Sequence, residues 1–213
     1  SGASGRTNVP PATNAPGPGG SGAFVAGGTL VRPLAPDLEA ALAAGAERRL
    51  AAYLELLRIP SISGLPEHAA DCRRAAEWLV DELCRIGLSS ASLAETGGHP
   101  IVHAEWLGAP GAPTVLLYCH YDVQPVDPLD EWTSTPFEPI RVGDRILGRG
   151  AADDKGNIAA ALGAIEALLA VRGGLPVNLK LVFEGEEESS SPFLDPWLEA
   201  NRERLGADVA LVA

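Results

Sequence analysis

Residues 114–122 read Thr-Val-Leu-Leu-Tyr-Cys-His-Tyr-Asp, an apolar run that leads directly into a histidine and a carboxylate. An uninterrupted run such as residues 114–119 is typical of a central strand buried on both faces of a sheet. On either side of it, hydrophobic periodicity predicts strands that alternate with helices. The expected strands span residues 89–94, 101–107, 177–183 and 208–212. The expected helices span residues 37–59, 67–86, 156–171 and 192–204. This alternation predicts an α/β fold, a three-layer sandwich with a largely parallel central sheet.

The composition narrows the classes of function. The 213 residues carry a formal net charge of −12, with a pI of about 4.7. This charge argues against a nucleic-acid partner, because no basic patch would offset phosphate repulsion. No apolar run reaches the roughly 18 residues of a membrane span, so no membrane partner is expected.

The cysteines indicate a reducing compartment. Cys72 and Cys84 lie on one expected helix, about 18 Å apart, which is too far for a disulfide. With Cys119 they form an odd, sparse set, and the N-terminus shows no charged-then-apolar signal pattern. These features predict a cytoplasmic protein.

Two regions are expected along the chain. Residues 1–36 are rich in Gly, Pro and Ala and show no periodicity, which predicts a disordered tail. The folded part is expected to begin near Asp37, a plausible helix N-cap, and to occupy residues 37–213.

Three polar segments follow or flank the expected strands. They are CHYD at residues 119–122, GAADDKGN at 150–157 and FEGEEES at 183–189. Each has an ordinary explanation when taken alone: a structural histidine, a solvated turn with a helix cap, and a solvated acidic loop. Because ligands bind beyond the carboxyl ends of strands in open α/β sheets, all three are expected at one edge. Their joint presence favours a metal site.

The residue types suggest which side chains could bind metal, orient a ligand or act as a general base. His120 and Asp122 are two residues apart, so in extended backbone both point the same way and Asp122 can accept a ring N–H of His120. Asp153 or Asp154 could bridge two cations. Glu187 and Glu188 would face opposite sides of an extended segment, so one could be a general base and the other a ligand.

These segments resemble the M20 family of metallopeptidases, and its dipeptidase branch most of all. The resemblance covers about residues 37–213 and is carried by HYDVQPVDPLDEW (120–132), PFEP (136–139), GRGAADDKGN (148–157) and EGEEES (184–189).

The resemblance implies a site with two zinc ions, for which manganese or cobalt could substitute. His120 would bind one metal, Glu188 the other, and Asp153 both. Glu187 would be the general base, Asp122 would orient His120, and the peptide bond between Asp153 and Asp154 would be cis.

Some residues depart from the family pattern. Cys119 stands where relatives often have Gly, either as a buried small residue, which we favour, or as a thiol near the metal. Ser189 and Ser190 replace a small or apolar residue plus Gly. The next family ligand, an Asp or Glu, would follow a strand like residues 208–213, and the last His would lie much further on. The sequence is therefore expected to be the N-terminal portion of a truncated catalytic domain without its lid, inactive by itself.

Three functions are compatible with these residues. The leading one is metal-dependent hydrolysis of a peptide bond, in a dipeptide or at a peptide C-terminus, by a full-length protein that is a homodimer. The second is deacylation or desuccinylation of an N-acyl amino acid with the same metals. The third is a non-catalytic α/β binding or scaffold module.

Overall fold

The structure is a computed structural model that describes residues 24–26, 29–31 and 33–213. It divides into two units, residues 1–36 and 37–213. In the first unit, strands β1 (Phe24–Ala26) and β2 (Thr29–Val31) pair antiparallel. Most of the tail predicted to be disordered lies outside the described residues, and these two strands were not predicted from the sequence.

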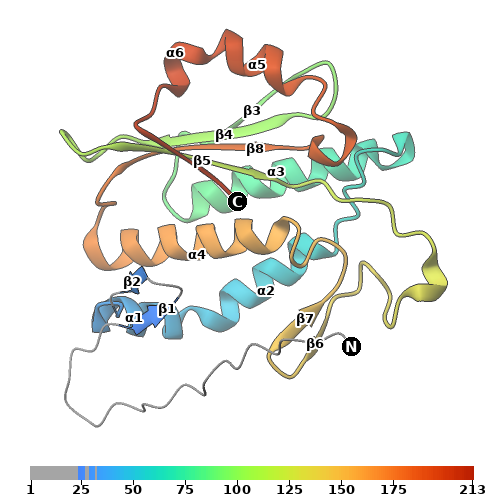
Figure 1. The fold of residues 1–213 in the computed structure, drawn as a ribbon, viewed down its shortest axis with the longest axis horizontal. Helices are drawn as coiled ribbons and strands as arrows, with labels where there is room; N and C mark the ends of the chain where they lie inside the picture. The colour runs from blue at the N-terminus through green and yellow to red at the C-terminus, as the bar shows by residue number, and fades with distance from the viewer. Residues whose placement is uncertain (1–23, 27–28, 32) are drawn as a thin grey trace, which may run out of the picture. The chain divides into compact units, whose positions relative to one another are not determined.

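The second unit is built on a five-stranded sheet in the order β3-β4-β8-β5-β9 (Figure 1). The strands are β3 (Ser92–Ala94), β4 (Ile101–Trp106), β5 (Thr114–His120), β8 (Asn178–Glu184) and β9 (Val209–Val212). Strand β5 pairs parallel with both β8 and β9, whereas β4 pairs antiparallel with both β3 and β8. Four strands therefore run the same way and only β4 runs against them, which confirms the largely parallel sheet.

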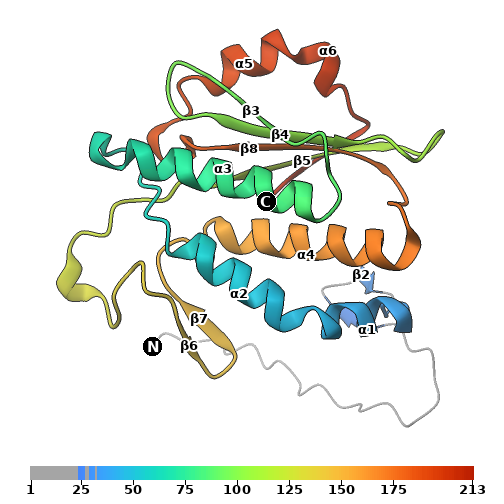
Figure 2. The same ribbon diagram turned by 180° about the vertical axis from the view of Figure 1, so that it is seen from behind.

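Helices cover both faces of this sheet (Figures 1 and 2). On one side lie α3 (Ala69–Arg85) and α4 (Lys155–Arg172), with α2 (Ala46–Leu57) packed on α4. On the other side lie α5 (Leu194–Ala200) and α6 (Arg202–Leu205). The predicted three-layer sandwich is confirmed.

Two helix predictions needed correction. The helix expected over residues 37–59 is divided into α1 (Pro36–Ala44) and α2 at Gly45, where glycine weakens helix continuity. Asp37 lies in the first turn of α1 and is not its N-cap. The helix expected over residues 192–204 is likewise interrupted, at Asn201.

The core lies between the sheet and α3 and α4. Leu181 and Phe183 of β8 are buried there, and so are Ile158 and Leu79 from the two helices. Strand β5 is less covered than its apolar run predicts, because its first residues are only half buried and the neighbouring strand β9 is exposed. The burial of β5 is complete at Cys119 and His120, where it meets the polar segments.

A long connection joins β5 to α4. It contains a short 3₁₀ turn, Leu129–Glu131, and a hairpin of β6 (Ile140–Val142) and β7 (Arg145–Leu147), which the sequence did not predict. All three cysteines are free, as expected. Within the described part of the chain, no helix combines the length and the apolar character needed to cross a bilayer.

Candidate metal centre

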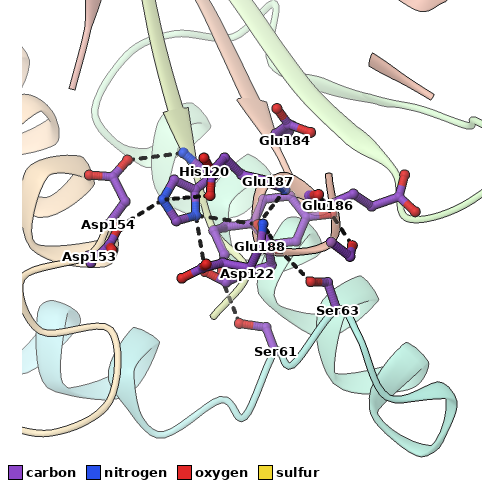
Figure 3. Close-up of polar contacts among 12 residues, drawn as sticks. Ser61, Ser63, His120, Asp122, Asp153, Asp154, Glu184, Glu186, Glu187 and Glu188 are labelled. Atoms are coloured by element: carbon purple, nitrogen blue, oxygen red, sulfur yellow. Dashed lines mark hydrogen bonds and ion pairs between the residues drawn. The ribbon is translucent and has the colours of Figure 1, made fainter. Parts of the chain in front are cut away.

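The three polar segments meet at the carboxyl edge of the sheet (Figure 3). Strands β5 and β8 run parallel, and their last residues, His120 and Glu184, are register partners. Strand β9 runs parallel to β5, with Val212 opposite Tyr118, so its carboxyl end lies at the same edge. The convergence expected from the sequence is therefore present.

His120 lies at the middle of this cluster and is only 5% exposed. Its Nε2 atom lies 3.0 Å from Asp153 Oδ1 and 3.9 Å from Glu187 Oε2. Its Nδ1 atom lies 3.4 Å from Asp122 Oδ1 and 3.2 Å from the Asp122 carbonyl oxygen. An Nδ1–H directed at Asp122 leaves Nε2 free for a metal, which is how second-sphere carboxylates orient metal-binding histidines.

The carboxylates around His120 also change its protonation. Burial lowers the pKa of His120, but hydrogen bonding and charge from Asp122, together with Asp154 and Asp153, outweigh burial and raise the pKa to about 9. The same carboxylates that favour a proton on this ring would favour a metal cation near it.

Asp122 has more partners than the sequence indicated. It is fully buried, and it accepts the backbone N–H groups of Glu187 at 3.2 Å and Glu188 at 3.0 Å. It also accepts the hydroxyl of Ser63 at 2.5 Å. Asp122 therefore joins His120 to the acidic segment after β8. Ser63 lies in a stretch, residues 58–63, with milder similarity to the family, but the sequence assigned it no role.

The acidic segment is a 3₁₀ turn, Glu187–Ser189, and not the extended segment assumed from the sequence. Its two glutamates nevertheless diverge. The Glu187 side chain, 46% exposed, lies on the His120 side. The Glu188 carboxylate accepts Gln124 Nε2 at 2.6 Å. The assignment of Glu188 as a metal ligand stays a prediction.

The two aspartates before α4 have different environments. The peptide bond between them is cis, as the family resemblance implied. The Asp153 side chain is 77% exposed and faces Nε2 of His120. Asp154 is buried and accepts the His120 backbone N–H at 3.0 Å and Asn157 Nδ2 at 2.6 Å. Adjacent identical residues gave no sequence signal of which one turns inward.

Two further buried ionisable residues were not singled out from the sequence. Glu184 accepts hydrogen bonds from the hydroxyls of Tyr118 and, at 2.9 Å, Ser191, while burial raises its pKa. Glu184 is the last residue of β8, so its carboxylate is buried at the end of an otherwise apolar strand. Lys155 is also fully buried, and its Nζ donates to the carbonyls of Leu56 at 3.1 Å and Ile59 at 2.7 Å.

The family departures have structural counterparts. Cys119 is buried, and burial together with Asp154 raises the pKa of its thiol to about 12, which supports its role as a buried small residue. Ser190, at the position where the family resemblance led us to expect Gly, adopts a left-handed φ of 76°. The turn therefore keeps a conformation that glycine adopts without steric cost.

The chemical types of the donor atoms in this site are those that divalent transition metals bind. An imidazole nitrogen and a carboxylate oxygen face each other at His120 and Asp153, and zinc, manganese and cobalt bind both. Across residues 33–213 and the two short strands before them, no group of three His, Cys, Asp or Glu side chains is arranged to hold an ion. Catalytic zinc sites use three protein ligands, so the described residues supply part of such a set.

Known proteins are similar to this chain in sequence and in fold. A family described as "Peptidase family M20/M25/M40" matches residues 116–213. The cysteinylglycine-S-conjugate dipeptidase of Corynebacterium striatum is 36% identical over 175 residues, which cover 78% of this chain and 36% of that protein.

Two solved structures extend the comparison. Human carnosine dipeptidase 1 has a TM-score of 0.76 at 30% identity, covering 85% of this chain and 42% of that one. An M20 family metallo-carboxypeptidase, Sso-CP2 of Sulfolobus solfataricus, has a TM-score of 0.71 at 42% identity. The match covers 77% of this chain and 36% of that one. The chain thus spans 36% to 42% of the length of these three proteins. The residues that match the family model, 116–213, include His120, Asp153, Asp154 and the 184–189 segment, and this part of the chain belongs to peptidase family M20/M25/M40.

Proposed function

We propose that the protein carrying this chain is a metal-dependent peptidase that cleaves a dipeptide or the C-terminal bond of a peptide. The observation that supports it most is the position of His120, with Nε2 3.0 Å from Asp153 Oδ1 and Nδ1 facing Asp122. Relatives named as dipeptidases and a carboxypeptidase support a small peptide as the substrate.

The proposed cofactor is a pair of zinc ions, with manganese or cobalt as substitutes. His120 would hold one ion, Glu188 the other, and Asp153 both. When bound, the ions would polarise the scissile carbonyl and lower the pKa of the attacking water. Asp122 would keep accepting the Nδ1–H of His120, so that Nε2 is the nitrogen that gives up its proton to bind the ion.

Glu187 is the proposed general base. Its carboxylate takes a proton from the attacking water as the water oxygen bonds to the carbonyl carbon. It returns that proton to the amine nitrogen as the C–N bond breaks. The half-exposed Glu187 side chain, 3.9 Å from His120 Nε2, has access to both solvent and the ligand residues.

Hydrolysis by the complete natural protein tests this proposal. Loaded with Zn²⁺, Mn²⁺ or Co²⁺, it should cleave members of a dipeptide panel, and Glu187→Gln should reduce kcat by about 10²- to 10⁴-fold with little change in KM. Glu203→Gln, on α6, is the control. Cleavage of N-acyl amino acids alone would point to the deacylase alternative. If the protein hydrolyses neither dipeptides nor N-acyl amino acids, both enzyme proposals fail and the non-catalytic binding or scaffold module is favoured.

The 213-residue chain by itself is proposed to bind metal weakly and to show negligible turnover. The two facing donors, His120 and Asp153, support this, since catalytic zinc sites use three. Tight binding of two ions per chain in calorimetry would contradict it. Homodimerisation of the complete protein stays a prediction that analytical ultracentrifugation would check.

A further inference from the structure

The fully buried Asp122 carboxylate needs donors on both oxygens, because an unpaired buried charge is strongly destabilising. Oδ1 accepts the N–H of Glu187 and faces His120 Nδ1. Oδ2 accepts the N–H of Glu188 and the hydroxyl of Ser63. A carboxylate offers about four acceptor positions, so these four donors use them all.

Three of these donors belong to residues proposed to act in catalysis, whereas Ser63 comes from a distant segment. Its O–H···O distance of 2.5 Å is that of a strong, charge-assisted hydrogen bond. In Figure 3 the Ser63 side chain reaches toward Asp122 from the loop that follows α2.

The segment that carries Ser63 is itself held in place. Ser61 donates its hydroxyl to the Tyr121 carbonyl at 2.7 Å, and its own carbonyl accepts the Val123 N–H at 2.9 Å. The ring of His99 contacts the Ser63 carbonyl at 3.3 Å. Lys155, the first residue of α4, donates from Nζ to the Ile59 carbonyl at 2.7 Å. Ser63 is therefore presented by a segment tied to both the end of β5 and the start of α4.

We infer that Ser63 is a positioning residue for the metal centre. Its hydroxyl fixes the rotation of the Asp122 carboxylate, and that carboxylate sets both the His120 ring and the Glu187–Glu188 turn. Without the hydroxyl, Oδ2 keeps a single donor and the carboxylate can rotate away from the turn. That this site binds metal rests on the proposed function, whereas the hydrogen bond between Ser63 and Asp122 does not.

The test compares Ser63→Ala with Ser63→Thr, which keeps the hydroxyl. Ser90→Ala is the matched control, because the Ser90 hydroxyl bonds to the backbone of Glu105 in β4 and, among the described residues, to no other group. Backbone amide exchange is measured by NMR on the metal-free 213-residue chain, and zinc affinity by calorimetry on the complete protein. Exchange at Leu181, in the core of β8, reports global opening.

In Ser63→Ala, exchange at Glu187 and Glu188 should accelerate about tenfold relative to Leu181. Zinc affinity should fall about 10- to 100-fold, the usual effect of losing a second-sphere partner. Ser63→Thr should restore both, and Ser90→Ala should change neither. Unchanged exchange at Glu187 and Glu188 in Ser63→Ala would overturn the inference. Because that measurement needs neither metal nor substrate, it gives its answer even if the proposed peptidase activity is absent.

Discussion

The Oδ2 atom of Asp122 accepts the backbone N–H of Glu188 at 3.0 Å. The residue that orients His120 thus also holds the turn bearing the proposed base, and the two halves of the site share one carboxylate. A change at Asp122 should therefore affect both halves together.

Replacing Asp122 with Asn tests this sharing. In this variant an NH₂ group replaces one carboxylate oxygen. The buried donors that face this oxygen in Asp122 then have no acceptor. The free energy of unfolding should fall by about 1–3 kcal/mol, and zinc affinity by about 10- to 100-fold. Urea denaturation and calorimetry measure these changes. Asp130→Asn, in the short 3₁₀ turn before Trp132, is the control and should change neither quantity.

Metal binding should depend on pH through His120. Its pKa of about 9 keeps the ring protonated in the metal-free chain at pH 7, and a metal must displace that proton. Apparent zinc affinity should rise about tenfold per pH unit between pH 6 and 8, with about one proton released per ion. Calorimetry in buffers of different ionisation enthalpy measures the release.

His68 provides a control for this pH dependence. It contacts Asp71 at 2.7 Å, before α3 and apart from the strand ends. His68→Gln should leave the proton release unchanged. Binding of zinc at pH 7 without any proton release would show that His120 is either neutral beforehand or not a ligand.

Lys155 should make stability depend on pH. Burial lowers its pKa to about 7 in the folded chain, from 10.5 in an exposed lysine. Between these values the unfolded chain binds more protons, so the free energy of unfolding should rise with pH from about 7 to 10.5. The slope from this one group cannot exceed about 1.4 kcal/mol per pH unit.

The difference between wild type and Lys155→Met isolates this contribution, and urea denaturation across pH 7–10 measures it. Lys180→Met is the matched control, because Lys180 also donates to two carbonyls but is only half buried. A wild-type profile parallel to that of Lys155→Met would mean that Lys155 stays charged when buried.

Ser190 offers a stabilising substitution. A residue with a side chain is disfavoured at a φ of 76° by about 1 kcal/mol relative to glycine. Ser190→Gly should therefore raise the free energy of unfolding by about 1 kcal/mol. Ser89→Gly, in a turn without positive φ, should instead lower it by about 0.5–1 kcal/mol. A loss of stability in Ser190→Gly would show that the serine side chain makes a compensating contact.

Local hydrophobic patterns in the sequence were enough to predict many of the helices and strands. The apolar runs at β5 and β8 and the Ala/Leu-rich run at α4 were each recognisable, because burial imposes a period on a continuous segment. The hairpin of β6 and β7 was missed: its strands have only three residues each and are largely exposed, so burial left no pattern there.

By itself, the sequence determined the α/β class and the sheet edge at which the polar segments meet, because strand direction and residue chemistry can be read from local segments. It also made His120 a candidate ligand, whereas only the family resemblance chose Asp153 over Asp154 and Glu187 over Glu188. Only the tertiary structure decided that Asp122 holds the Glu187–Glu188 turn, that Asp154 turns inward while Asp153 stays exposed, and that Ser63 completes the Asp122 shell. Each of these depends on which donors reach a buried carboxylate from residues more than thirty positions away, and no local pattern encodes that distance.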